Sequence, residues 1–107
     1  MDFKTFGNID LPALLLIPGL GVSYEIFRPL VRLLEDRFHI ITAQVDGFTL
    51  DRHTEFTSID DQAWQIAEFV NENRGGHIDV AYGLSLGGKI LSRILERNDV
   101  DIDHAIL

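Results

Sequence analysis

The pentapeptide Gly83-Leu84-Ser85-Leu86-Gly87 is the feature of the sequence that most constrains how the chain can fold. It follows a largely apolar run, residues 78–82, and precedes a helix-like pattern. A serine at such a strand-to-helix turn needs a strained backbone, and the residues two before and two after it crowd together unless both are glycine. Gly83 and Gly87 meet this requirement. The pattern therefore predicts a nucleophile elbow that lifts the Ser85 hydroxyl above a sheet, beside the amino end of a helix.

Two other interpretations of this stretch need to be weighed. Gly83, Gly88 and Lys89 fit most of the phosphate-loop pattern G-x-x-x-x-G-K-[ST]. Ile90 stands where that loop needs a hydroxyl to hold magnesium, which argues against a nucleotide site. In a purely structural interpretation, the glycines shape a tight turn and Ser85 is an ordinary helix N-cap. We favour the elbow, with Gly88 as a further small residue of the turn.

Two further features of the sequence argue against ligands that carry phosphate. Gly19-Leu20-Gly21 begins a dinucleotide fingerprint, but Tyr24 occupies the position of the third glycine. The net charge is −8, so the long-range field repels nucleic acids and anionic membrane surfaces. No pair or cluster of side chains has the spacing of metal ligands. We therefore expect no cofactor, no metal and no nucleic-acid partner.

The composition is that of one compact globular unit, residues 1–107. Hydrophobic residues make up 46% of the chain and the mean hydropathy is +0.09, so the chain can bury a core. The sequence contains no cysteine, which excludes disulfides and thiolate nucleophiles and fits a reducing compartment. Because no apolar run approaches the roughly 20 residues that span a bilayer, and the first residues are not a leader, we expect a cytoplasmic location.

Strands and helices alternate along the chain. Apolar runs predict strands at residues 11–17, 38–45, 78–82 and 102–107, and helical periodicity predicts helices at residues 24–37, 59–74 and from 88 onward. Ser23 and Ser58 are available as N-caps, and Gly75-Gly76 ends the second helix. Pro29 requires either a helix that begins near Arg28 or an irregular turn before it. The third helix is expected to bury Ile90, Leu91, Ile94 and Leu95.

This order predicts an α/β fold with three layers, α/β/α, around a mostly parallel sheet of about four strands. In such sheets the reactive groups gather beyond the carboxyl ends of the strands. Three loops converge there, at residues 18–23, 46–57 and 83–87. The candidate site is therefore built from these loops around Ser85.

With the strand that leads to Pro18-Gly19 upstream and the Gly-Leu-Ser-Leu-Gly-Gly elbow downstream, the chain resembles the N-terminal half of the α/β-hydrolase fold family, from about Leu11 onward. The resemblance implies a serine hydrolase in which backbone amides form an oxyanion hole. These donors would be Leu86, immediately after the nucleophile, and Leu20, in the loop after the first long strand, where Pro-Gly replaces the family's common His-Gly. Gly19, Gly21 and Tyr24 are the residues expected to contact substrate.

The resemblance also implies a sheet order and an incomplete catalytic triad. The strand at residues 38–45 should lie on one side of the strand at 11–17, with the elbow strand on the other side and the last strand at an edge. The triad acid and histidine would follow Leu107, so we expect the chain to be part of a longer hydrolase and to be nearly inactive alone.

Substitutes for these two groups are poor. His39, His77 and His104 lie toward the starts of strands, opposite Ser85, and only His53 lies in a loop on the correct side. The loop carboxylates, Asp46 and Asp51, are best interpreted as turn-forming and solubilising residues.

Two accounts of function follow. In the first, the intact protein hydrolyses an ester, thioester or related acyl substrate through Ser85. In the second, the chain is a non-catalytic hydrolase-like half-domain that binds a partner, or self-associates through the last strand, because a half sheet leaves an edge and apolar surface uncovered.

Overall fold

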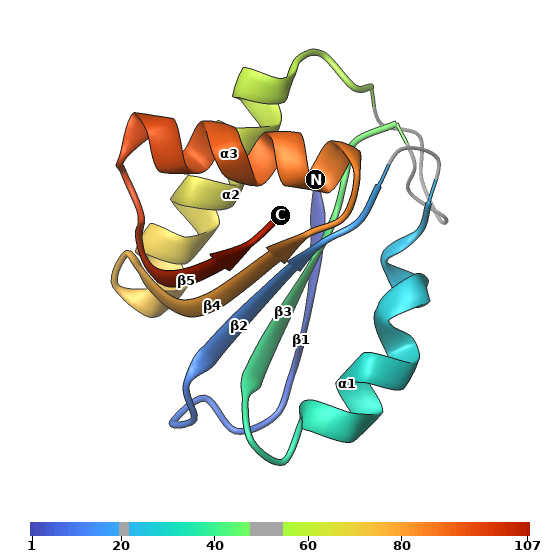
Figure 1. Cartoon of the computed structure of the whole chain (residues 1–107), viewed down its shortest axis with the longest axis vertical. Helices are drawn as coiled ribbons and strands as arrows, with labels where there is room; N and C mark the ends of the chain where they lie inside the picture. The colour runs from blue at the N-terminus through green and yellow to red at the C-terminus, as the bar shows by residue number, and fades with distance from the viewer. Residues whose placement is uncertain (20–21, 48–54) are drawn as a thin grey trace.

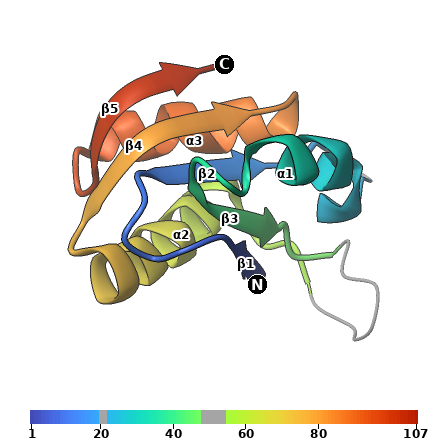
Figure 2. The same ribbon diagram turned by 90° about the horizontal axis from the view of Figure 1, so that it is seen from below.

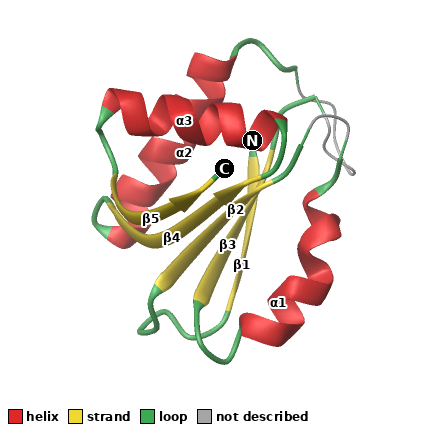
Figure 3. Ribbon diagram, viewed as in Figure 1, coloured by secondary structure: helices red, strands yellow, loops and turns green. Residues whose placement is uncertain are grey.

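A five-stranded sheet forms the centre of the computed structural model, which describes residues 1–19, 22–47 and 55–107. Helices cover both faces of the sheet (Figure 1), and Figure 3 separates helices from strands by colour. The strands are β1 (Asp2–Phe6), β2 (Ala13–Ile17), β3 (His39–Gln44), β4 (His77–Gly83) and β5 (Asp101–Ile106). The helices are the 3-10 helix η1 (Tyr24–Phe27), then α1 (Arg28–Leu34), α2 (Ile59–Arg74) and α3 (Leu86–Arg97).

The strand order is β1-β3-β2-β4-β5, visible from edge to edge in Figure 2. The expected order is confirmed, because β3 and β4 flank β2 and β5 lies at an edge. The fifth strand, β1, was not predicted. It pairs antiparallel with β3, with Phe3 opposite Ala43, whereas the other pairs are parallel. The chain is therefore a mostly parallel α/β/α unit with one added antiparallel edge.

Two apolar cores lie on opposite faces of the sheet. Alternate residues of β2 point to opposite faces, so Leu15 joins the core beneath α2 and α3 while Leu14 and Leu16 join the core beneath α1. All of β2 and β3 is buried, as expected for strands covered on both faces. Because β2 runs parallel to β3 and to β4, the loops that follow these three strands reach the same edge of the sheet.

The helix boundaries follow local signals. The Ser58 side chain accepts a hydrogen bond from the Asp61 amide, and Gly75 ends α2 with a left-handed backbone, φ 63°. Both alternatives for Pro29 hold at once, since η1 precedes α1 and the proline lies in the first turn of α1. Ser23 caps η1 by accepting from the Glu25 amide.

Two local expectations are wrong. Leu95 is 38% exposed, because the buried stripe of α3 consists of Ile90, Leu91 and Ile94 instead. His104 does not lie near the start of β5 but pairs with Val80 in its middle. Among the described residues, no helix is both long and apolar enough to cross a membrane.

Candidate active site at the carboxyl edge of the sheet

Ser85 stands between β4 and α3 with a backbone that amino acids with side chains rarely adopt, φ 57° and ψ −115°. It occupies the N-cap position of α3, yet its side chain makes no capping hydrogen bond. The residue is exposed. The hydroxyl is therefore not used to terminate the helix, and it stands at the amino end of α3, where the helix dipole favours negative charge.

Gly83 and Gly87 permit this turn because backbone segments pack against each of them too closely to leave room for a side chain. A Cβ atom on Gly83 would lie 2.4 Å from the Gly87 carbonyl oxygen, and one on Gly87 would lie 2.2 Å from the Ile17 carbonyl oxygen. Gly88 is less tightly enclosed, since its nearest neighbour, the Gly83 oxygen, would be 3.2 Å away. The phosphate-loop interpretation gains nothing here, because Ile90 is fully buried in the core.

The strain at Ser85 predicts an increase in stability when it is removed. Glycine adopts this conformation without cost, so Ser85→Gly should raise the free energy of unfolding by about 1 kcal/mol, the strain less the added chain entropy. Ser92→Gly, in the regular interior of α3, is the matched control and should lower it by a similar amount. Urea denaturation of both variants measures the difference. A destabilised Ser85→Gly variant would show that the turn is not strained.

The loop after β2 packs directly against the elbow. The Leu84 amide donates to the Ile17 carbonyl oxygen at 3.0 Å, and a Cβ atom on Gly19 would lie 3.2 Å from the Ser85 Cβ. Leu20 and Gly21 lie outside the described residues. The Leu86 amide makes no hydrogen bond to any part of the chain that the structure describes. It is therefore available to an acceptor placed beside Ser85.

Tyr24 lies farther along this loop, at the start of η1. Its amide donates to the Gln44 Oε1 at 2.9 Å, which ties the loop to the end of β3. Its ring lies under the Lys4 ammonium, 5.6 Å from the ring centroid, and lines a cavity of about 230 Å³ between α1 and the β1 edge. No elbow residue lines that cavity. Substrate contact by Tyr24 remains a prediction.

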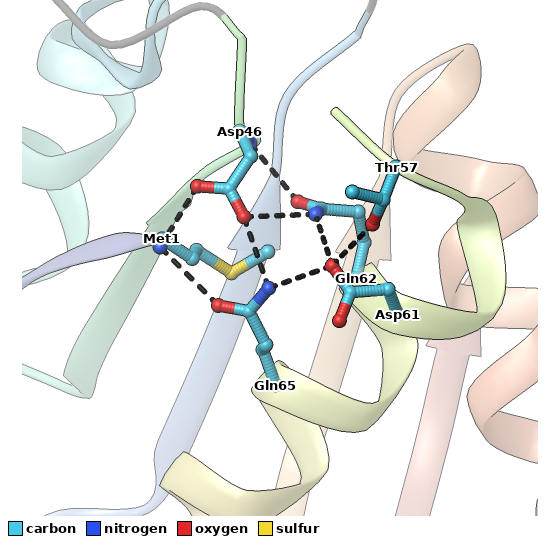
Figure 4. A network of polar contacts seen from close by, with 6 residues as sticks. All are labelled: Met1, Asp46, Thr57, Asp61, Gln62 and Gln65. Carbon is cyan, nitrogen blue, oxygen red and sulfur yellow. Dashed lines mark hydrogen bonds and ion pairs between the residues drawn. The ribbon is translucent and has the colours of Figure 1, made fainter. Parts of the chain in front are cut away.

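Asp46 begins the third loop, and its surroundings differ from those expected. It is 5% exposed, so its role is not solubility. Its carboxylate pairs with the α-amino group of Met1 at 2.8 Å and accepts from the Nε2 atoms of Gln62 and Gln65, both at 2.9 Å (Figure 4). Asp61 accepts from the same two amides. The network joins the residue before β1, the segment after β3 and α2.

The electrostatics of this network favour an ionised Asp46. Burial opposes the charge, but the Met1 amino group and the two glutamine amides outweigh it, so the pKa of Asp46 lies below its ordinary value of 3.8. The roles of Gln62 and Gln65 were not predicted from the sequence. The available signal was the position of Gln62 on the buried stripe of α2, between Ile59 and Ile66, where a polar side chain needs partners.

None of the histidines that the structure describes lies at the elbow. His39 is buried at the start of β3, where its Nδ1 contacts the Gly7 carbonyl oxygen at 3.1 Å. His77 begins β4 and contacts Asp103 at 3.1 Å, an interaction that raises the pKa of the imidazole. His53 and Asp51 lie outside the described residues. The described site thus holds a nucleophile candidate and an amide donor, and no base beside them.

Comparisons with known proteins identify the fold. A family model described as alpha/beta hydrolase fold matches residues 12–107. No curated protein sequence matches the chain.

Three solved structures illustrate the similarity. An α/β hydrolase family protein from Desulfitobacterium hafniense superposes with a TM-score of 0.89 at 24% identity, covering 94% of this chain and 41% of its own. A marine microorganism esterase superposes with a TM-score of 0.85 at 18% identity, and the match covers 97% of this chain and 39% of the esterase. A thermophilic esterase from Thermogutta terrifontis superposes with a TM-score of 0.84 at 21% identity, and the match covers 97% of this chain and 38% of that esterase. The chain thus spans about two fifths of the length of the structures it matches.

Proposed function

The chain belongs to the α/β-hydrolase fold family, and from that premise we propose that it carries the nucleophile half of a serine hydrolase acting on ester or thioester substrates. The observation that carries the proposal is the exposed Ser85, held at φ 57° and ψ −115° before the amino end of α3 with no capping role. Retaining a conformation that costs of order 1–3 kcal/mol is explained if the hydroxyl acts on a ligand.

In the proposed reaction, the Ser85 Oγ attacks the carbonyl carbon of the substrate and transfers its proton to a general base. The resulting oxyanion accepts hydrogen bonds from the amides of Leu86 and Leu20, each of which contributes about 3 kcal/mol in comparable sites. The leaving group takes a proton and departs, and water then releases the acyl group from the serine. The acid and histidine that run these proton transfers are proposed to lie beyond Leu107.

A fluorophosphonate probe tests the proposal. The full-length protein should become labelled at Ser85, and Ser85→Ala should lose the label because no other serine among the described residues lies on a strand-to-helix turn of this kind. Ser92→Ala, in the same helix, is the matched control and should label as the parent does. A parent protein that stays unlabelled, under conditions that label a known serine hydrolase, would contradict the assignment.

A second candidate role is favoured by the β5 edge. Most of β5 is exposed, and two apolar side chains beside this edge, Ile106 and Leu107, are 52% and 67% exposed. We propose that this edge pairs with the remainder of a longer hydrolase or, in the 107-residue chain, with a second copy.

Sedimentation of the 107-residue chain tests this pairing. The parent chain should associate and Ile106→Lys should be monomeric, because a charge interrupts the apolar edge. Leu33→Lys makes the same change at a 75% exposed leucine on α1 and should still associate. A parent chain that is a folded monomer at high concentration would remove this candidate.

A further inference from the structure

A shallow groove runs between β1 and the outer side of α2, on the face of the sheet that α2 covers. It encloses about 270 Å³ and is lined by Phe3, Trp64, Gln65, Glu68, Phe69 and Glu72. Phe3 and Phe69 stack with their ring centroids 4.0 Å apart and form its apolar wall. Trp64 is 49% exposed. The groove therefore combines aromatic faces with two carboxylates.

The two carboxylates of this groove are unpaired. Glu68 and Glu72 lie one helical turn apart and are exposed, and neither has a cationic partner among the described residues. Like charges at this spacing destabilise a helix by a few tenths of a kcal/mol. Trp64 stands one turn earlier on the same ridge, and an indole face attracts ammonium and guanidinium groups. All three side chains favour a cation.

We propose that this groove binds an extended segment of a partner protein that carries lysine or arginine at alternate positions. The carboxylates of Glu68 and Glu72 are separated by about 6 Å along the helix axis. Alternate side chains of an extended strand are about 6.6 Å apart on one face. Two cations at positions i and i+2 therefore match the two carboxylates, while the aliphatic stems lie against Phe3 and Phe69.

The position of β1 supports an extended rather than a helical ligand. β1 is the edge strand of the described sheet, so a segment that runs beside it places alternate side chains over the groove. Electrostatics oppose the other occupants. The net charge of −8 repels nucleic acid and anionic membranes, and it attracts a basic segment.

Peptide titration tests this inference, with Trp64 as the reporter because it is the only tryptophan in the sequence. The probe is a capped heptapeptide in which lysine and threonine alternate. Its addition should change the Trp64 fluorescence with saturation, and the signal should vanish in Trp64→Phe. A comparison peptide has the same composition. Both peptides hold three lysines, and in the comparison peptide these stand three residues apart. This peptide should bind about threefold more weakly, because neighbouring lysines then lie on opposite faces of an extended strand and only one reaches the two carboxylates.

Charge variants decide between groove binding and general attraction. Glu68→Gln with Glu72→Gln should weaken binding about fivefold, whereas Glu35→Gln, on the opposite face of the sheet, should leave it unchanged. Binding should also weaken when ionic strength rises from 0.01 to 0.15 M. No saturable signal, or equal affinity in the double variant and the parent, would overturn the proposal. Circular dichroism of each variant establishes that it is folded.

Discussion

Gly87→Ala should lower the free energy of unfolding by about 3 kcal/mol or more, and it should do so although it adds a single methyl group. The added Cβ would lie 2.2 Å from the Ile17 carbonyl oxygen and 2.7 Å from that of Pro18. Both neighbours are backbone atoms of the central strand and the loop behind it. They cannot rotate away as a side chain would, so relief requires β2 and α3 to separate.

Gly88→Ala is the matched control for this prediction. It adds the same methyl group one residue later, where the nearest atom, the Gly83 oxygen, is 3.2 Å away. Because alanine also favours the helical backbone, the net change should stay within about 1 kcal/mol. Urea denaturation of the two variants measures both values. If Gly87→Ala unfolds at the same urea concentration as the parent, the close packing of the elbow on β2 is wrong.

Asp46→Asn should lower the free energy of unfolding by about 3 kcal/mol, because it removes the buried counter-ion of the Met1 ammonium. The Met1 side chain is buried and Asp46 is 5% exposed, so little water can replace the lost partner. Asparagine also turns a donor toward the amides of Gln62 and Gln65, which need acceptors. Asp36→Asn makes the same change at an exposed aspartate, and its free energy of unfolding should stay within about 0.5 kcal/mol of that of the parent.

The pH dependence of the free energy of unfolding tests the same interaction in a second way. The pKa of Asp46 is lower in the folded chain than in the unfolded one, so its contribution to stability is fully present above the ordinary value of 3.8 and is lost as pH falls through the lower, folded value. Asp46→Asn lacks this component. The stability difference between parent and variant should therefore narrow between pH 7 and pH 3. A difference that is constant over this interval would contradict the pairing.

Much of the sheet could be predicted because its central strands carry their own signals. Residues 13–17 are apolar without interruption, which is typical of a strand covered on both faces, and the glycines around Ser85 indicate the turn that follows β4. β1 could not be predicted in the same way. Lys4 and Thr5 are exposed in it, and the strand exists because of its pairing with β3, a contact between distant parts of the sequence.

The role of Asp46 shows the same limit within the site. Followed by glycine after a strand, an aspartate is most simply interpreted as a turn residue. Its actual partners come from the first residue of the chain and from α2, and no local pattern connects them. Leu95 was misplaced because helical spacing puts it on the same face as Leu91, and spacing alone does not show that Leu91 is buried while Leu95 is 38% exposed.

The hydrogen bond from Leu84 to Ile17 has a consequence for how the chain acquires its structure. β2 lies early in the sequence, whereas β4, which pairs with it, comes after β3 and α2. The hydrogen bond between Leu84 and Ile17 therefore closes a long loop. The turn at Ser85 is held in its unfavourable shape by that contact. We therefore expect the turn that positions the hydroxyl to form after both crossovers have docked, late in folding.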